Sequence, residues 1–243
     1  MIMRFFGLIL TIILGLCVSM SAWSAVVITG TRVIYPADNK EVNIFLNNIA
    51  KEPALVQAWV DSDESTVNTD KPIPFILTPP IFRMEGGKTQ TLRLIYTKEP
   101  LPKDRESLFY FNLLDIPPKP KGEDAPENYL QIAVSSRLKL FFRPKNLTPS
   151  VSEAPKKLEL TLQNQKLTIH NPTPYYITIN SVHLLTHQKD ENPVVLDDVP
   201  MIEPFGKQIV DIQNNADNRS FTHTDIEVIN DYGGTSKVSV NLK

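Results

Sequence analysis

Arg32 is the charged residue whose position most suggests a chemical role. It lies in the middle of a predicted strand, residues 26–35, among apolar neighbours and within the motif Thr31-Arg32-Val33. A guanidinium held by a strand can act as a fixed cation that receives an anionic group. A residue on the solvated face of a sheet produces the same pattern, so both interpretations stay open from this strand alone.

The chain offers few other candidates for chemistry. His183 and His187 would share one face of a strand, but no third ligand type is spaced with them as a zinc site requires. The sequence contains no G-x-S-x-G motif, no phosphate-binding glycine loop and no HExxH motif. Ser, His and Asp occur without a motif that would join them into a triad. We therefore expect no metal, no cofactor and no enzymatic activity.

Residues 128–144, NYLQIAVSSRLKLFFRP, predict one long strand around which the other elements are organised. At about 3.3 Å per residue it would be roughly twice as long as a typical strand. The two-residue period places an apolar row on one face, formed by Leu130, Ile132, Val134, Ser136 and Leu138. Such a strand is either a central core strand or an edge strand that offers its apolar row to another protein. Pro144 ends its ladder pairing.

The first 24 residues have the pattern of an export signal. Arg4 precedes an apolar run, and Ala22-Trp23-Ser24 resembles a cleavage site, so we expect cleavage after Ser24. Cleavage one residue later and an uncleaved anchor are the alternatives. The single cysteine, Cys17, lies inside this segment. Loss of Arg4 changes the formal net charge from −2 to −3, which argues against a nucleic-acid partner.

The remaining residues, 25–243, are enough for two cores of about 100 residues each. Short alternating runs separated by Pro, Asn, Asp or Gly predict an all-β sandwich protein. In the first half of the chain this alternation points Ile44, Leu46, Leu92 and Leu94 to one side of their strands, and Trp59 is expected to anchor the core.

Five segments then appear in an order that resembles one known family. They are DRESLFYFN, IPP, RLKLFFRP, NPTPYYITI and INDYGG. In this order, behind an export signal, they resemble the signatures of PapD-like periplasmic pilus (fimbrial) chaperones. The segment between Pro118 and Tyr129 is short and no cysteine pair flanks the long strand, as in the short-loop type of the family.

The resemblance implies two immunoglobulin-like β-sandwich domains in an L or boomerang arrangement. We accordingly divide the chain into a signal peptide (1–24), an N-terminal immunoglobulin-like chaperone domain (25–145) and a C-terminal one (146–243). It also implies three sets of site residues. Arg32 and Lys139 would anchor the C-terminal carboxylate of a pilus subunit. The donor strand would present Leu130, Ile132 and Val134, and Glu106, Arg143 and Asp231 would form an interdomain ion cluster.

The function implied is that of a periplasmic chaperone that binds, folds and caps fimbrial subunits by donor-strand complementation and delivers them to the outer-membrane usher. This process is an established example of strand addition. The alternative is a structural pilin or a secreted adhesin-like sandwich protein, although a pilin usually has one incomplete sandwich. Whether the free chain self-associates to shield its apolar row stays open.

Overall fold

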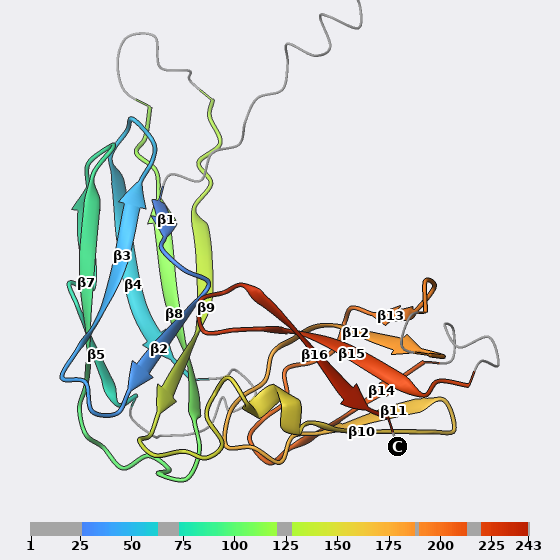
Figure 1. Ribbon diagram of the computed structural model, residues 1–243. Helices are drawn as coiled ribbons and strands as arrows, with labels where there is room; N and C mark the ends of the chain where they lie inside the picture. Colours follow the sequence, from blue (N-terminus) through green and yellow to red (C-terminus); the bar gives the residue numbers. More distant parts are fainter. Residues whose placement is uncertain (1–25, 63–72, 121–127, 188–189, 213–219, 243) are drawn as a thin grey trace, which may run out of the picture.

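The computed structural model describes residues 26–62, 73–120, 128–187, 190–212 and 220–242. The expected signal peptide and its cleavage site lie outside the described residues. Figure 1 shows two all-β domains that meet at an angle and give the molecule an L shape. The first contains β1 to β9 and the second contains β10 to β16. The expected all-β architecture with two sandwiches is therefore confirmed.

The N-terminal domain consists of two sheets packed face to face. The first sheet has the order β1 (Val26–Ile28), β3 (Val42–Asn48), β7 (Thr89–Tyr96) and β5 (Phe75–Thr78). The second has the order β2 (Arg32–Pro36), β9 (Val134–Arg143), β8 (Ser107–Ile116), β4 (Ala54–Asp61) and β6 (Ile81–Met84). Most neighbours pair antiparallel, but β2 and β9 pair parallel.

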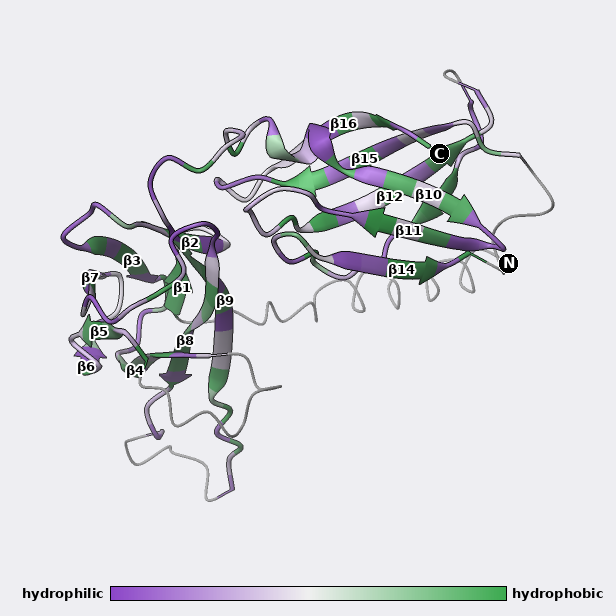
Figure 2. Cartoon of the chain, turned by 90° about the horizontal axis from the view of Figure 1, so that it is seen from below, coloured by the Kyte–Doolittle hydropathy of each residue, from purple (hydrophilic) through white to green (hydrophobic). Residues whose placement is uncertain are grey.

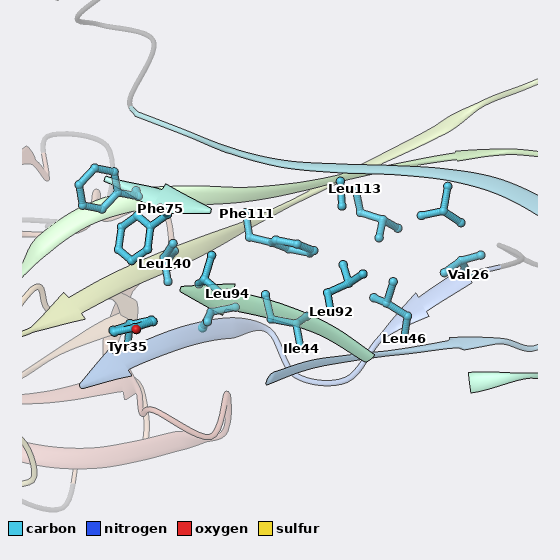
Figure 3. Packing of buried hydrophobic residues seen from close by; sticks show 14 of the residues in the cluster. Val26, Tyr35, Ile44, Leu46, Phe75, Leu92, Leu94, Phe111, Leu113 and Leu140 are labelled. Carbon is cyan, nitrogen blue, oxygen red and sulfur yellow. The ribbon is translucent and has the colours of Figure 1, made fainter. Parts of the chain in front are cut away.

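The alternation of the sequence correctly predicts most of the inward side chains of this domain. Ile44, Leu46, Leu92 and Leu94 are buried in its core, and Figure 3 shows them between the two sheets. The expectation for Trp59 is wrong. The inward positions of β4 are Ala54, Val56 and Ala58, so the odd-numbered Trp59 lies on the opposite face and is only half-buried.

The predicted strand 26–35 is two strands in the structure. β1 belongs to the first sheet and β2 to the second, with residues 29–31 between them. Gly30 has a φ of 99°, a conformation that a glycine adopts without steric cost. The chain thus changes sheets just before Arg32, which becomes the first residue of β2.

The C-terminal domain is a second sandwich. One sheet has the order β10 (Glu159–Gln163), β11 (Lys166–His170) and β14 (Lys207–Asp211). The other has the order β13 (Val194–Leu196), β12 (Ile179–Leu185), β15 (His223–Ile229) and β16 (Thr235–Asn241). A short 3-10 helix, Ala154–Lys157, precedes β10. Figure 2 shows hydrophobic and hydrophilic positions alternating along these strands, as expected for strands with one face in a core.

Candidate functional site

Strand β9 is paired on both sides over only part of its length. It pairs with β8 from Val134, opposite Asp115, to Phe142, opposite Ser107. Its pairing with β2 begins only at Lys139, which lies opposite Arg32. Among the described residues, no strand pairs with that second edge between Val134 and Leu138. This half of β9 is therefore an open sheet edge, which can accept a strand from another chain.

Of the five positions on the predicted apolar face, Leu130 and Ile132 lie just before the open edge of β9 and Val134 lies at its start; these three form the exposed apolar row. The exposed fractions of Leu130, Ile132 and Val134 are 83%, 62% and 39%. Val134 is in phase with Leu138, Leu140 and Phe142, which pack in or against the core of the N-terminal domain. Three exposed aliphatic side chains beside an open edge are unusual for a monomeric protein and indicate a binding surface. Their assignment as donor residues stays a prediction.

The prediction of one strand from residue 128 is wrong at its beginning. Residues 128–133 have no regular secondary structure, and β9 begins at Val134. The reason lies in the partner strand, because β8 ends at Ile116 and is followed by Pro117 and Pro118, which have no backbone N–H to donate. The side-chain amide of Gln131 donates to the carbonyl oxygen of Pro117 at 2.6 Å instead.

The two predicted anchoring cations lie next to each other where the open edge ends. Arg32 and Lys139 are register partners in the parallel β2–β9 ladder, so their side chains emerge on the same face. Neither forms a salt bridge with a carboxylate within the described part of the chain. Arg32 donates from one terminal nitrogen to the carbonyl oxygen of Ile229 at 3.1 Å, and its buried Nε has no partner among the described residues.

The pKa values of both cations are lowered, mainly by burial. Burial lowers the pKa of Lys139, and the positive charge of Arg32 lowers it further. Burial also lowers the pKa of Arg32, although the charges of Asp231 and Glu106 act in the opposite direction. An anion placed between the two side chains would offset both effects.

Arg32 also faces a cavity of about 310 Å³ between the two domains. Its walls include Phe141 and Arg143 from β9, and Tyr175 and Tyr232 from the C-terminal domain. The ring of Phe141 lies 5.8 Å from the guanidinium carbon of Arg32. Lys139 does not line this cavity. Arg32 therefore belongs to the interdomain cavity, and Lys139 lies beside it in the neighbouring strand.

The three residues of the predicted ion cluster are in direct contact. Arg143 donates from Nε to Glu106 at 2.7 Å and from its two terminal nitrogens to Asp231 at 2.6 and 2.8 Å. The second oxygen of Glu106 accepts the backbone N–H of Tyr176 at 2.9 Å. Glu106 directly precedes β8 and Arg143 is the last residue of β9, whereas Asp231 and Tyr176 belong to the C-terminal domain. The cluster therefore joins the two domains.

Burial shifts the pKa values of Glu106 and Arg143 in opposite directions. It raises the pKa of Glu106, against the influence of Arg143 and of the Tyr176 N–H. It would lower the pKa of Arg143, but the hydrogen bonds and charges of Asp231 and Glu106 outweigh it and raise that pKa. We take Glu106 as ionised, because two donors contact its oxygens. The Glu106 side chain is only 2% exposed, so water does not solvate its negative charge and Arg143 must compensate it.

Two contacts of this region were not predicted from the sequence. They are the carbonyl group of Ile229, which holds Arg32, and the side chain of Gln131, which holds the segment before β9. A backbone carbonyl has no residue-specific signal. Gln131 lies on the polar face of an alternating run, where nothing distinguishes it from a solvated side chain.

Among the described residues, no group of three His, Cys, Asp or Glu side chains is placed to hold a metal ion. His183 instead shares a hydrogen bond with the hydroxyl group of Ser181 at 3.0 Å. Within the described ranges, no helix has the length and apolar character needed to cross a membrane.

Two family models match the chain in succession. Residues 25–148 match "Pili and flagellar-assembly chaperone, PapD N-terminal domain", and residues 153–240 match "Pili assembly chaperone PapD, C-terminal domain". Among curated proteins, the chain is 38% identical to the probable fimbrial chaperone YadV of Escherichia coli K12, with 92% of each chain covered. It is 42% identical to the chaperone protein HifB of Haemophilus influenzae, covering 88% of this chain and 86% of the relative.

Solved structures show the same two-domain architecture. The crystal structure of the YadV chaperone superimposes with a TM-score of 0.72 at 36% identity, covering 90% of this chain and 100% of that one. A structure of the Salmonella enterica SafA pilin in complex with the SafB chaperone matches with a TM-score of 0.73 at 26% identity, covering 90% of this chain and 97% of that one.

Proposed function

Because this chain belongs to the PapD family of pilus-assembly chaperones, we propose that it binds fimbrial subunits along the open edge of β9 and holds their C-terminal carboxylate between Arg32 and Lys139. The chain is a fimbrial chaperone of the chaperone-usher pathway. The alternative of a structural pilin or adhesin is not favoured, since the curated relatives of this chain are chaperones.

The single observation that carries this proposal is the place where the open edge of β9 ends. The position beside β9 is unpaired, within the described residues, from Val134 to Leu138 and is taken by β2 from Lys139 onward. A subunit strand that extends the sheet there must therefore stop where Arg32 begins β2. Its terminal carboxylate then arrives at two cations that have no carboxylate partner among the described residues.

A carboxylate that leaves water for a partly buried site needs charge-assisted hydrogen bonds. Arg32 keeps donors that are not used by Ile229, and Lys139 can supply an ammonium group from the neighbouring strand. Fixing the end of the subunit strand also fixes its register. A slip of one residue would turn the opposite face of that strand toward the apolar row.

The apolar row supplies what the groove of a subunit lacks. A pilin that misses its last strand exposes a hydrophobic groove, and Leu130, Ile132 and Val134 are exposed and available to fill it. Full burial of such side chains is worth about 1.5–3 kcal/mol each. Loss of rotational and translational freedom on association offsets part of this gain.

The same proposal covers the location of the chaperone, its delivery of the subunit and its need for cofactors. The chaperone works in the periplasm after export, caps the subunit and delivers it to the outer-membrane usher. It uses no nucleotide, cofactor or metal and catalyses no reaction, because strand exchange at a sheet edge needs only binding energy. The support for location and usher delivery is the export-signal pattern and the family relationship. Support for the subunit partner comes from the related SafA–SafB complex.

Replacing Arg32 or Lys139 with Ala is expected to leave the chaperone folded and to abolish accumulation of its subunit. Without one cation, the carboxylate would be left poorly solvated in the cleft. The measurement is the yield of soluble one-to-one complex from the periplasm after co-expression with the pilin that the wild-type chaperone captures.

The matched control is Lys145→Ala, which removes an exposed cation near the joint that is paired with Asp38. This variant should retain wild-type yields. Normal subunit levels with a folded Arg32→Ala/Lys139→Ala protein would refute the anchoring assignment. Incorporation of the chain itself into fibres would refute the chaperone function.

A further inference from the structure

We propose that Gly233, in the turn between β15 and β16, is a positioning residue for the carboxylate site. The absence of a side chain at Gly233 lets the C-terminal domain approach Thr31 closely, and this approach fixes Arg32 in the orientation that receives the carboxylate. The inference rests on the proposed function, because it assumes that Arg32 binds the subunit terminus. It adds a residue from the other domain to that site.

The contact between Gly233 and Thr31 leaves no space for a side chain. A Cβ atom on Gly233 would lie 2.3 Å from the hydroxyl oxygen of Thr31 and 3.3 Å from two further carbons of that side chain. Gly233 also has a φ of 83°, which disfavours other residues. Figure 1 shows the turn between β15 and β16 reaching the N-terminal domain beside β9. Thr31 directly precedes Arg32.

The same turn carries the groups that hold the two arginines of the cleft. The carbonyl oxygen of Ile229, at the end of β15, accepts a hydrogen bond from Arg32 at 3.1 Å. Asp231, two residues later, accepts two hydrogen bonds from Arg143. A shift of the turn would therefore change the contacts of both arginine side chains at once.

Hydrogen bonds within the turn hold it together, so residues 230–234 should move as a unit. The N–H of Gly233 donates to the carbonyl oxygen of Asn230 at 3.0 Å, and the N–H of Asn230 donates to the carbonyl oxygen of Gly234 at 2.9 Å. The side-chain oxygen of Asn230 accepts the N–H groups of Tyr232 and Gly234 at 3.0 and 3.1 Å. Displacement of Gly233 by a new methyl group would thus also displace the carbonyl group of Ile229.

Lys139 would not follow this movement, because its backbone is held in β9 between β8 and β2. Once released from Ile229, the guanidinium of Arg32 would lose its fixed orientation, while Lys139 stays in place as its register partner. The expected defect is therefore specific. Recognition of the carboxylate should be lost, whereas the open edge and apolar row of the N-terminal domain should still bind an extended chain.

The test uses a soluble synthetic peptide of alternating Val and Thr, made once with a free C-terminal carboxylate and once as the C-terminal amide. Dissociation constants of both forms are measured for the full chaperone. Wild type should bind the acid about tenfold or more tightly than the amide, because only the acid gains charge-assisted hydrogen bonds. Gly233→Ala should bring this ratio close to one and leave the affinity for the amide unchanged.

Three further variants separate the steric contact from other effects. Gly87→Ala introduces a side chain at a φ of 65° with no atom within 4 Å, and Gly234→Ala places a methyl group in the same turn with no neighbour nearer than 3.5 Å. Both should keep the wild-type ratio. Adding Thr31→Ala to Gly233→Ala removes the nearest clashing atoms and should restore the ratio.

Each outcome decides one question. If wild type binds acid and amide equally, the proposed anchoring by Arg32 fails. If wild type discriminates and Gly233→Ala discriminates equally well, or if Gly87→Ala loses the ratio to the same extent, the role of Gly233 is refuted. If Gly233→Ala does not fold, the double variant decides, since a folded double variant without discrimination refutes the inference and one with a restored ratio supports it.

Discussion

Ile132→Asp is expected to eliminate subunit binding and to leave the melting temperature of the free chaperone almost unchanged. The side chain of Ile132 is 62% exposed, so a charge there costs the free protein little. In the complex the same position is expected to enter the apolar groove of the subunit, where a carboxylate would have no partner. The measurement compares thermal melting with subunit pull-down for this one variant.

Two matched variants show whether the effect is specific. Ile132→Leu keeps an apolar side chain and should keep binding. Ile209→Asp places the same charge at a similarly exposed aliphatic position, 65% exposed, in the C-terminal domain, and should also keep binding. Should Ile132→Asp unfold the free chaperone, Ile132 would belong to its own core and the donor face would be assigned to the wrong side.

Arg143→Ala is expected to lower the free energy of unfolding by about 3–5 kcal/mol, the range for removing one member of a buried ion pair. Its side chain is 17% exposed and its partner Glu106 only 2%. Without Arg143, the carboxylate of Glu106 would keep one hydrogen bond, from the backbone of Tyr176, and no cationic partner of its own in the cluster. Denaturant titration of the wild type and the variant measures the loss.

The control is Arg83→Ala, which removes a salt bridge of the same 2.7 Å length whose side chains are 66% and 59% exposed. Exposed pairs of this kind contribute about 0–1 kcal/mol. A loss for Arg143→Ala within about 0.5 kcal/mol, the usual range of surface substitutions, would show that the cluster does not stabilise the joint between the domains.

The alternation of apolar and polar residues in the sequence predicts which side chains of a strand share one face. Alternation was enough to find the core positions Ile44, Leu46, Leu92 and Leu94. It also placed Leu130, Ile132 and Val134 on one face, but it did not decide whether that face is exposed. The resemblance to a family then named charged residues that the structure brings together across large sequence separations. The contacts of Arg143 with Glu106 and Asp231 are the clearest example.

Features that depend on a partner strand could not be predicted in this way. The alternation continues through residues 128–133, but those residues have no strand because β8 ends before its two prolines. The division of β1 from β2 at Gly30 depends on which sheet each segment joins. The size of Trp59 predicts a core position, whereas its phase along β4 places it on the opposite face.

The most direct test of the central claim is amide hydrogen exchange over residues 128–138, compared between the free chaperone and its purified complex with a pilin subunit. In the free protein, residues 128–133 have no regular secondary structure and should exchange rapidly. Donor-strand complementation would give their N–H groups a partner in the subunit, so we predict strong protection of this segment on binding. Unchanged rapid exchange of residues 128–133 in a stable complex would contradict the account.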